Sequence, residues 1–299
     1  MKKVLVPLFT AALCAVLLCG CRMSVRPSVG LSSFRYDHAE QYTGGGAILT
    51  DAVERVEIHW LSGSVAVQAH GEDTISFSEE ANRELTKDDC LYYRLEGTTT
   101  LLIQFCRSGK WDLNGLEKEL TVLLPEELLL KDLEIDSVSA EIAAEGVGTE
   151  AANLNTVSGD IRLTDCGITR RAELDTVSGG VAAELTQPLE SLYAGTVSGH
   201  MEVTAPEIGA FHGDTTSGAV SLAVDATPRE LDIDTVSGDV TLHLPEEADF
   251  ALEVDTVSGD FSSELPCAQK DGRYLCGSGT GIYGIDTTSG DIRMQRGGV

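Results

Sequence analysis

A six-residue phrase, Asp-Thr-Val-Ser-Gly-Asp in its commonest form, recurs along the second half of this 299-residue chain. Its eight copies begin at Asp136, Asn155, Asp175, Gly195, Asp214, Asp234, Asp255 and Asp286. The first seven copies lie 19 to 21 residues apart, and the last interval is 31 residues. A short fixed period is typical of a solenoid, in which each unit buries its apolar face only against its neighbours. The repeat therefore argues against an ordinary globular domain over these residues.

Apolar residues within each repeat alternate with period two, which indicates strands rather than helices. In residues 231–244 the alternation shifts by one residue at Val236. Such a shift turns a straight strand inside out, so the chain must bend there for both apolar sets to face inward. We therefore expect the corner valines, among them Val157, Val177 and Val236, to point into the core. The glycine after each serine supplies the permissive backbone of such a corner.

Stacking the repeats in chain order aligns apolar residues in columns down one interior. One column is Leu133, Ala152, Ala172, Leu192, Phe211, Leu231, Leu252 and Tyr283, and another is Ile142, Ile161, Val181, Met201, Val220, Val240, Phe261 and Ile292. At about 4.8 Å per strand, eight coils make a rod of roughly 40 Å. We predict an all-β chain with a single β-solenoid over residues 133–299.

Residues 51–132 are expected to form an irregular N-terminal capping segment, because solenoids need atypical ends. Residues 53–69 read as a degenerate copy of the repeat, with Gly63 at its corner. Residues 91–105 contain two β-prone runs around a Gly-Thr turn, a pattern that predicts a hairpin.

The N-terminus has the anatomy of a secretory signal. A short basic start precedes an apolar run from Val4 to Leu18, which is too short to span a bilayer. The run ends in Leu-Cys-Gly-Cys21, which resembles the lipobox of bacterial lipoproteins. This resemblance implies removal of residues 1–20, a diacylated Cys21 and an extracytoplasmic, lipid-anchored place at the bacterial cell membrane. The alternative is an ordinary signal peptide with an accidental cysteine. Residues 21–50 are predicted to be a flexible stalk because they carry Ser, Pro, Gly and scattered charges.

Five cysteines remain once the leader and the lipid anchor are set aside. Folding the 91–105 hairpin brings Cys90 opposite Cys106, while Cys267 and Cys276 bracket a polar loop of hairpin size. Each disulfide would restrict the unfolded chain and so stabilise the folded protein, by roughly 3 kcal/mol for a loop of about 15 residues. Both pairs are therefore disulfide candidates, which suits an exported protein. Cys166 is left over, either as a buried apolar residue or as a free thiol.

Polar columns accompany the apolar ones, and each has a structural explanation. Corner Thr and Ser can bond the backbone of neighbouring coils, and the Asp before Thr can cap its own turn. Stacked Asp columns, together with Asp160, Asp239, Asp260 and Asp291, could instead form a calcium ladder. The chain lacks the Gly-Gly-x-Gly-x-Asp spacing of calcium-binding repeats, and its His and Cys form no zinc pattern. We therefore expect neither a metal nor another cofactor.

The charge balance limits the partners. With 48 acidic against 21 basic residues, the formal net charge is −27. Nucleic acid binding depends on clustered Lys and Arg, so we expect no nucleic acid partner. Negative charge also opposes adhesion of the protein surface to an anionic membrane, which leaves the lipid on Cys21 as the expected membrane contact.

Three features resemble a known family. They are the opening Ile58-x-x-x-x-Gly-x-Val-x-Val, the bridge Leu120-x-Val-x-Leu-Pro and the run of Asp-Thr-Val-Ser-Gly-Asp repeats. Together they resemble the bacterial domain of unknown function 4097, a family described as candidate adhesins, over about residues 50–296. The resemblance implies a β-solenoid at the bacterial envelope and brings no established activity or catalytic residues with it.

Enzyme classes lack their usual signatures in this sequence. Polysaccharide-cutting β-helix enzymes need clustered carboxylates beside a basic residue, whereas the carboxylates here are spread one per coil. The nucleophile pattern Gly-x-Ser-x-Gly is absent, and the only clear break in the repeat is the loop between Cys267 and Cys276. We expect a non-enzymatic adhesin or envelope scaffold whose strand faces bind an unidentified envelope polymer or protein. The alternatives are a signalling or envelope-stress accessory of a membrane partner, and a calcium-binding or polysaccharide-acting β-helix.

Overall fold

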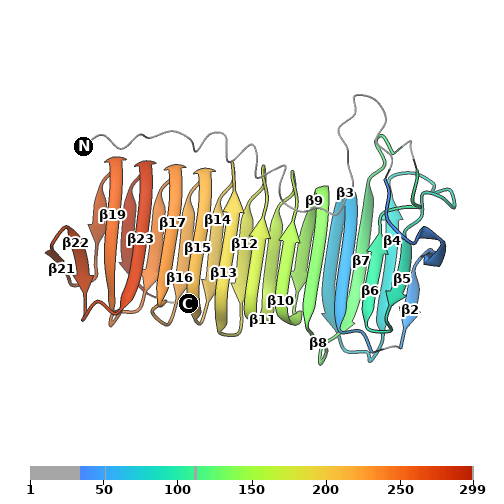
Figure 1. Cartoon of the computed structure of the whole chain (residues 1–299), viewed down its shortest axis with the longest axis horizontal. Coiled ribbons are helices and arrows are strands. Elements are labelled where there is room, and N and C mark those ends of the chain that lie inside the picture. The colour runs from blue at the N-terminus through green and yellow to red at the C-terminus, as the bar shows by residue number, and fades with distance from the viewer. Residues whose placement is uncertain (1–33, 51, 111–112, 298–299) are drawn as a thin grey trace.

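The structure is a computed structural model that describes residues 34–50, 52–110 and 113–297. It is a long, flattened stack of strands that lie side by side across the long axis of the molecule (Figure 1). Besides the strands, the described ranges contain one short 3-10 helix, η1 (Ala39–Gln41). The prediction of an all-β solenoid is therefore confirmed.

The strands of the N-terminal part are β1 (Thr43–Gly44), β2 (Ala47–Leu49), β3 (Arg55–His70), β4 (Ile75–Ala81), β5 (Tyr92–Glu96), β6 (Thr100–Gln104), β7 (Lys118–Pro125) and β8 (Leu129–Leu130). The first regular coils contain β9 (Asp132–Glu145), β10 (Gly148–Asn155), β11 (Ile161–Asp175), β12 (Val181–Leu185), β13 (Leu189–Thr196), β14 (Met201–Ala205), β15 (Ile208–Ser217) and β16 (Val220–Val224). The remaining strands are β17 (Glu230–Ser237), β18 (Val240–Leu244), β19 (Phe250–Ser258), β20 (Phe261–Ser263), β21 (Cys267–Lys270), β22 (Arg273–Cys276), β23 (Gly281–Ser289) and β24 (Ile292–Arg296).

Each regular coil contributes two strand segments, one to each of two layers. The first half of β9 pairs in parallel with β10, and its second half pairs in parallel with the beginning of β11. The first layer continues through the second half of β11 to β13, β15 and β17. The second layer continues through β12, β14, β16 and β18. Parallel, in-register pairing therefore stacks each repeat directly on its neighbour.

The core is one continuous apolar cluster that runs through both layers. Every member of the two predicted apolar columns is buried, except Phe261, which is partly exposed at one end of the rod. Full burial of one such aliphatic side chain stabilises the folded state by about 1.5–3 kcal/mol. The columns therefore supply the main cohesion between coils.

The corner between the layers comes later in the repeat than the sequence predicts. Val157 and Val236 are 40% and 39% exposed, and Val177 is partly exposed. The expectation that these valines face the core is therefore wrong. The preceding threonine, for example Thr235, takes the inward position instead. The chain reverses inside and outside across the Val-Ser-Gly segment rather than at the Thr-Val step.

The inward threonines bond the neighbouring coil in the first part of the rod. The Thr176 hydroxyl donates to the Gly159 carbonyl at 2.9 Å, and the Thr196 hydroxyl donates to the Gly179 carbonyl at the same distance. A hydroxyl that finds a backbone acceptor can be buried without a large desolvation cost. These bonds account for the inward threonine in the first coils, whereas the buried hydroxyls of Thr215, Thr235 and Thr287 have no hydrogen-bond partner among the described residues.

The corner glycines are required by close packing and not by an unusual backbone angle. The glycines of the repeated phrases, from Gly159 to Gly290, have no positive φ, whereas Gly63, at the corner of the degenerate coil, has φ 102. A Cβ on Gly179 would overlap with the carbonyl of Gly159 in the preceding coil, and Gly199 stands in the same relation to Gly179. The coils therefore touch backbone to backbone at this column.

The last repeat does not occupy the last place in the stack. β23 pairs with β17 on one side and with β19 on the other, and β24 lies likewise between β18 and β20. The C-terminal coil is thus inserted between two coils that precede it in the chain (Figure 1). Stacking in chain order, as predicted, is wrong here. The insertion is possible because all three coils present the same columns in register.

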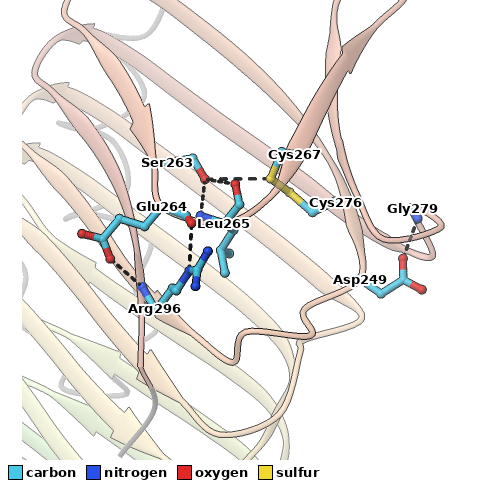
Figure 2. Close-up of a disulfide and its surroundings, with 8 residues drawn as sticks. All are labelled: Asp249, Ser263, Glu264, Leu265, Cys267, Cys276, Gly279 and Arg296. Carbon is cyan, nitrogen blue, oxygen red and sulfur yellow. Dashed lines mark hydrogen bonds between the residues drawn. A yellow bond between two sulfur atoms is a disulfide. The ribbon is translucent and has the colours of Figure 1, made fainter.

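The long interval between the last two repeats forms the cap of the rod. β21 and β22 make an antiparallel hairpin, and β22 adds to the outer edge of β19 over Phe250–Leu252. Cys267 and Cys276 are opposite each other in this hairpin and form a disulfide (Figure 2). The Asp249 carboxylate accepts the backbone N–H of Gly279 and so fixes the return of the chain (Figure 2). What the sequence presents as an insertion is therefore an end cap and a crossover.

The opposite end of the rod is closed by antiparallel strands. β3 pairs with β9 along both of its halves, so it is a complete, degenerate coil. β6 and β7 then extend the first and second layers beyond β3 in parallel. β5 and β1 follow β6, and β4 and β2 follow β7, all in antiparallel pairings. These strands form an N-terminal cap on the rod.

Residues 34–50 belong to this cap and not to the predicted stalk of residues 21–50. Phe34 is buried and packs against Phe105, with ring centroids 6.3 Å apart. The glycines between β1 and β2 form a tight turn, in which Gly45 has φ 97 and a Cβ on Gly46 would overlap with the backbone of Phe77. The remaining part of the predicted stalk, residues 21–33, lies outside the described residues.

Cys90 and Cys106 are free thiols, so the predicted disulfide between them is not formed. The β5–β6 pairing ends before it reaches either cysteine. Beyond that point the buried Lys118 ammonium donates to the carbonyls of Asp89 and Phe105, the residues that precede the two cysteines. It also forms a 2.6 Å ion pair with Glu79. Lys118 therefore lies between the two backbone segments that a disulfide would join.

We expect Gly199→Ala to destabilise the protein by about 1–3 kcal/mol, because the new methyl group must displace the Gly179 carbonyl of the preceding coil. Urea unfolding followed by circular dichroism measures this loss. Gly71→Ala is the matched control, since a Cβ on Gly71 would meet nothing within 4 Å. Equal stability of the two variants would contradict backbone contact at the corner.

We expect the double variant Cys267→Ser/Cys276→Ser to loosen the tip of the rod without unfolding the cap at the other end. In the chain-entropy model, removing a disulfide that closes a loop of this size lowers the free energy of unfolding by roughly 2–3 kcal/mol. Hydrogen exchange should become faster in β19 and β22 while β3 and β9 keep their protection. Uniform loss of protection along the rod would show that the disulfide has no local role.

Candidate functional site

The outer surface of the first layer carries two parallel columns of polar side chains. The column at the start of each repeated phrase contains Asp136, Asn155, Asp175, Gly195, Asp214, Asp234, Asp286 and Asp255 in spatial order. The column two residues earlier contains Glu134, Asn153, Glu173, Tyr193, His212, Asp232, Gly284 and Glu253. Most positions are carboxylates, so departures from this pattern mark places where the surface differs.

Three adjacent departures form one cluster on β13 and β15. Tyr193 and His212 replace carboxylates in the second column, and their rings stack with centroids 5.4 Å apart. The Tyr193 hydroxyl is 3.1 Å from a carboxylate oxygen of Asp214, to which it donates a hydrogen bond. The His212 ring nitrogens are 3.2 Å from Asp214 and 3.3 Å from Asp232. The cluster therefore joins an aromatic surface to two carboxylates.

Gly195 makes room for this arrangement. A Cβ at residue 195 would lie against a carboxylate oxygen of Asp175 and against the hydroxyl of Tyr193. The Tyr193 ring and the Asp175 carboxylate therefore lean over the place where a side chain would otherwise stand. Burial raises the pKa of Asp175 to about 7, and the like charges of Glu173 and Asp214 add to the shift.

A shallow groove of about 500 Å³ lies beside the cluster and crosses β11, β13, β15 and β17. Its floor is low because Ser191 and Ala210 are small, whereas Arg171 and Glu230 stand at the same position on the flanking strands. Tyr193 and His212 form one wall. The groove thus offers an aromatic wall, both acidic and basic hydrogen-bonding side chains, and a partly exposed floor.

The carboxylates that follow the corner glycines accept hydrogen bonds from the backbone of neighbouring coils. Asp160 accepts the backbone N–H of Gly180 in the next coil at 2.8 Å, and Asp239 accepts that of Asp291 at 2.9 Å. Asp291 in turn accepts the N–H of Asp260. These hydrogen bonds give a structural role to Asp160, Asp239 and Asp291, three of the residues that could have formed a calcium ladder. Among the described residues, no group of three or more His, Cys, Asp or Glu side chains is placed to hold a metal ion.

The other predicted site residues lie away from the groove. Cys21 is outside the described residues. Cys267 and Cys276 are in the hairpin at the tip of the rod, and Cys90 and Cys106 are in the opposite cap. Cys166 is a buried free thiol, and burial raises its pKa. No helix among the described residues is long and apolar enough to cross a membrane.

The groove was not predicted from the sequence, although a signal for it was present. Gly195 occupies the place of Asp or Asn in the repeated phrase, so the disulfide loop is not the only break in the pattern. An alignment of the residues two positions before each phrase would also have shown Tyr193 and His212 as aromatic residues in a mostly acidic column. Their meeting with Asp214 and Asp232 depends on the parallel register of neighbouring coils.

Comparison with known proteins supplies a family and distant structural similarities. The profile of the family described as Toastrack DUF4097 matches residues 53–295. The chain is similar to a candidate cell adhesion protein from Clostridium sporogenes ATCC 15579, with 12% identity, a TM-score of 0.25 and coverage of 85% of this chain and 100% of the other. It is also similar to a candidate adhesin from Bacteroides fragilis NCTC 9343, with 13% identity, a TM-score of 0.44 and coverage of 86% and 98%. None of the curated proteins matches the sequence.

The raised pKa of Asp175 predicts a pH dependence of stability. The pKa of Asp175 is about 7 in the folded protein and near 3.9 in the unfolded chain. The folded state is therefore favoured at pH 4, where the carboxyl group is protonated in the folded protein, and this contribution to the free energy of unfolding is lost as the pH rises to 7. Asp175→Asn stays neutral and should be more stable than the wild type at pH 8 by roughly 1–3 kcal/mol, but not at pH 4. Urea unfolding at both pH values measures this difference. Asp73→Asn, in an exposed loop, is the control and should not change the pH profile.

Proposed function

Because the chain belongs to the Toastrack DUF4097 family, we propose that it is a non-enzymatic, adhesin-like binding protein of the bacterial envelope. Its contact surface is the groove on the outer face of the first layer, beside Tyr193 and His212. The partner is an envelope polymer or protein that lies along this face. The anchor is lipid on Cys21, as the lipobox implies.

The single observation that supports this proposal is the groove itself. Its walls stand on strands paired on both edges, so β13 and β15 hold Tyr193 and His212 without reorganisation of the backbone. Rigid presentation lowers the entropy cost of binding, because few groups are ordered when the partner arrives. An aromatic wall beside hydrogen-bonding side chains is also a common composition of ligand sites.

The length of the anchor segment limits how far the N-terminal cap can lie from the membrane. Twelve residues separate Cys21 from Phe34, and fully extended they can span about 45 Å. Phe34 packs in the N-terminal cap, so the lipid would hold this cap near the membrane.

We expect Ser191→Trp to fill the groove and to weaken partner binding at least tenfold. Binding of the purified protein to a glycan array and to immobilised bacterial cell-wall fractions measures the effect. Ser221→Trp, on the outer face of the second layer, is the matched control and should bind as the wild type does. Equal binding by both variants would reject the groove as the contact surface, and release of cleaved glycan would reject the non-enzymatic assignment.

A further inference from the structure

The tip of the rod is closed over only part of its width. One edge of the terminal strand β19 is paired with β23 from Phe250 to Ser258. On the other edge, β22 covers β19 over Phe250–Leu252 and no further. Among the described residues, no strand pairs with the outer edge of β19 beyond Leu252 or with the outer edge of β20. A row of backbone donors and acceptors is therefore left at this edge.

The core columns are uncovered at the same place. Val254 is partly exposed, whereas Ile233 and Ile285 in the same column are 0% exposed. Phe261 is partly exposed, whereas Ile292 beside it is 1% exposed. The corner valine of this coil, Val257, is 82% exposed, about twice the value for Val236. Open backbone and open core therefore coincide, a combination that an added strand would cover.

The hairpin stops at Leu252 for a local reason. Arg273, the first residue of β22, forms a 2.9 Å ion pair with Glu253, and the chain turns away at Asp271 and Gly272, which both have positive φ. The line of β22 is therefore vacant beside Val254–Ser258. Five residues of strand span about 17 Å, enough for a short peptide to pair.

Charge distinguishes between possible occupants of this edge. Asp255 points outward from the open part of β19, and Asp260 follows at the corner; both are exposed. Burial raises the pKa of the adjacent Asp286, and the like charge of Asp255 adds to the shift. A second copy of this acidic tip would add carboxylates opposite these ones, which is unfavourable. A strand with basic side chains would be attracted instead.

We propose that the open edge of β19 at the tip of the rod binds an extended, cationic peptide segment of another protein by β-strand addition. The peptide pairs its backbone with Val254–Ser258. Because residues opposite each other share a face, basic side chains lie beside Asp255 and the alternate apolar side chains cover Val254. This inference is independent of the groove and of the proposed adhesin-like function.

The test uses the whole protein and a six-residue peptide of alternating lysine and valine, with alternating glutamate and valine as the control peptide. We expect the basic peptide to bind and to slow hydrogen exchange in β19 beyond Leu252. Asp255→Lys should weaken binding at least tenfold. Asp234→Lys, at the same column in a coil with strands on both edges, should weaken it less than threefold.

Four outcomes of the peptide experiments would overturn the proposal. They are no binding of the basic peptide at millimolar concentration, equal binding of the acidic peptide, equal loss in the two variants, and peptide binding without protection of β19. A dimer that forms in solution and that the basic peptide cannot dissociate would assign the edge to a second copy instead. Ser191→Trp should leave peptide binding unchanged, which separates this test from that of the groove.

Discussion

Backbone contact between coils is the constraint on which the rest of this structure depends. Parallel pairing places residue upon residue at the strand spacing, and at the corner the coils approach so closely that a Cβ on Gly179 would overlap with the Gly159 carbonyl. One repeat can meet another only in the same register. Every chemical property of the repeat is therefore copied down the rod as a column: apolar columns inside, a threonine column at the corner and carboxylate columns outside.

Column geometry also explains how a uniform scaffold acquires a local feature. A substitution in one repeat changes one residue of a column, and this residue then lies against the corresponding residues of the two adjacent coils. Tyr193, Gly195 and His212 lie on two successive levels, so together they convert a stretch of carboxylates into an aromatic wall. Ser191 and Ala210, on the same two strands, lower the floor beside that wall. The groove is thus a change of side chains on an unchanged backbone.

The ends of a solenoid lack a neighbour, and this chain closes its two ends by different means. At the N-terminal end, antiparallel strands complete both layers, and a buried ammonium at Lys118 ties backbone carbonyls to Glu79. At the other end, a disulfide-linked hairpin covers β19 only over Phe250–Leu252 and leaves the edge beyond Leu252 open. The stability of a stacked array depends on its terminal contacts, so this asymmetry concentrates local opening at the tip.

The sequence by itself determined the strand period, the two apolar columns, the existence of a solenoid and the position of the Cys267–Cys276 hairpin, because these follow from spacing along the chain. Only the tertiary structure decided where the C-terminal coil inserts, since repeats that share one register are interchangeable and sequence order does not rank their positions. It also decided that residues 34–50 close the cap, that Lys118 separates Cys90 from Cys106, and that threonine rather than valine turns inward at the corner. Those outcomes depend on contacts between residues that are distant in the sequence, such as the Phe34 ring on Phe105 and the Lys118 ammonium on the Phe105 carbonyl.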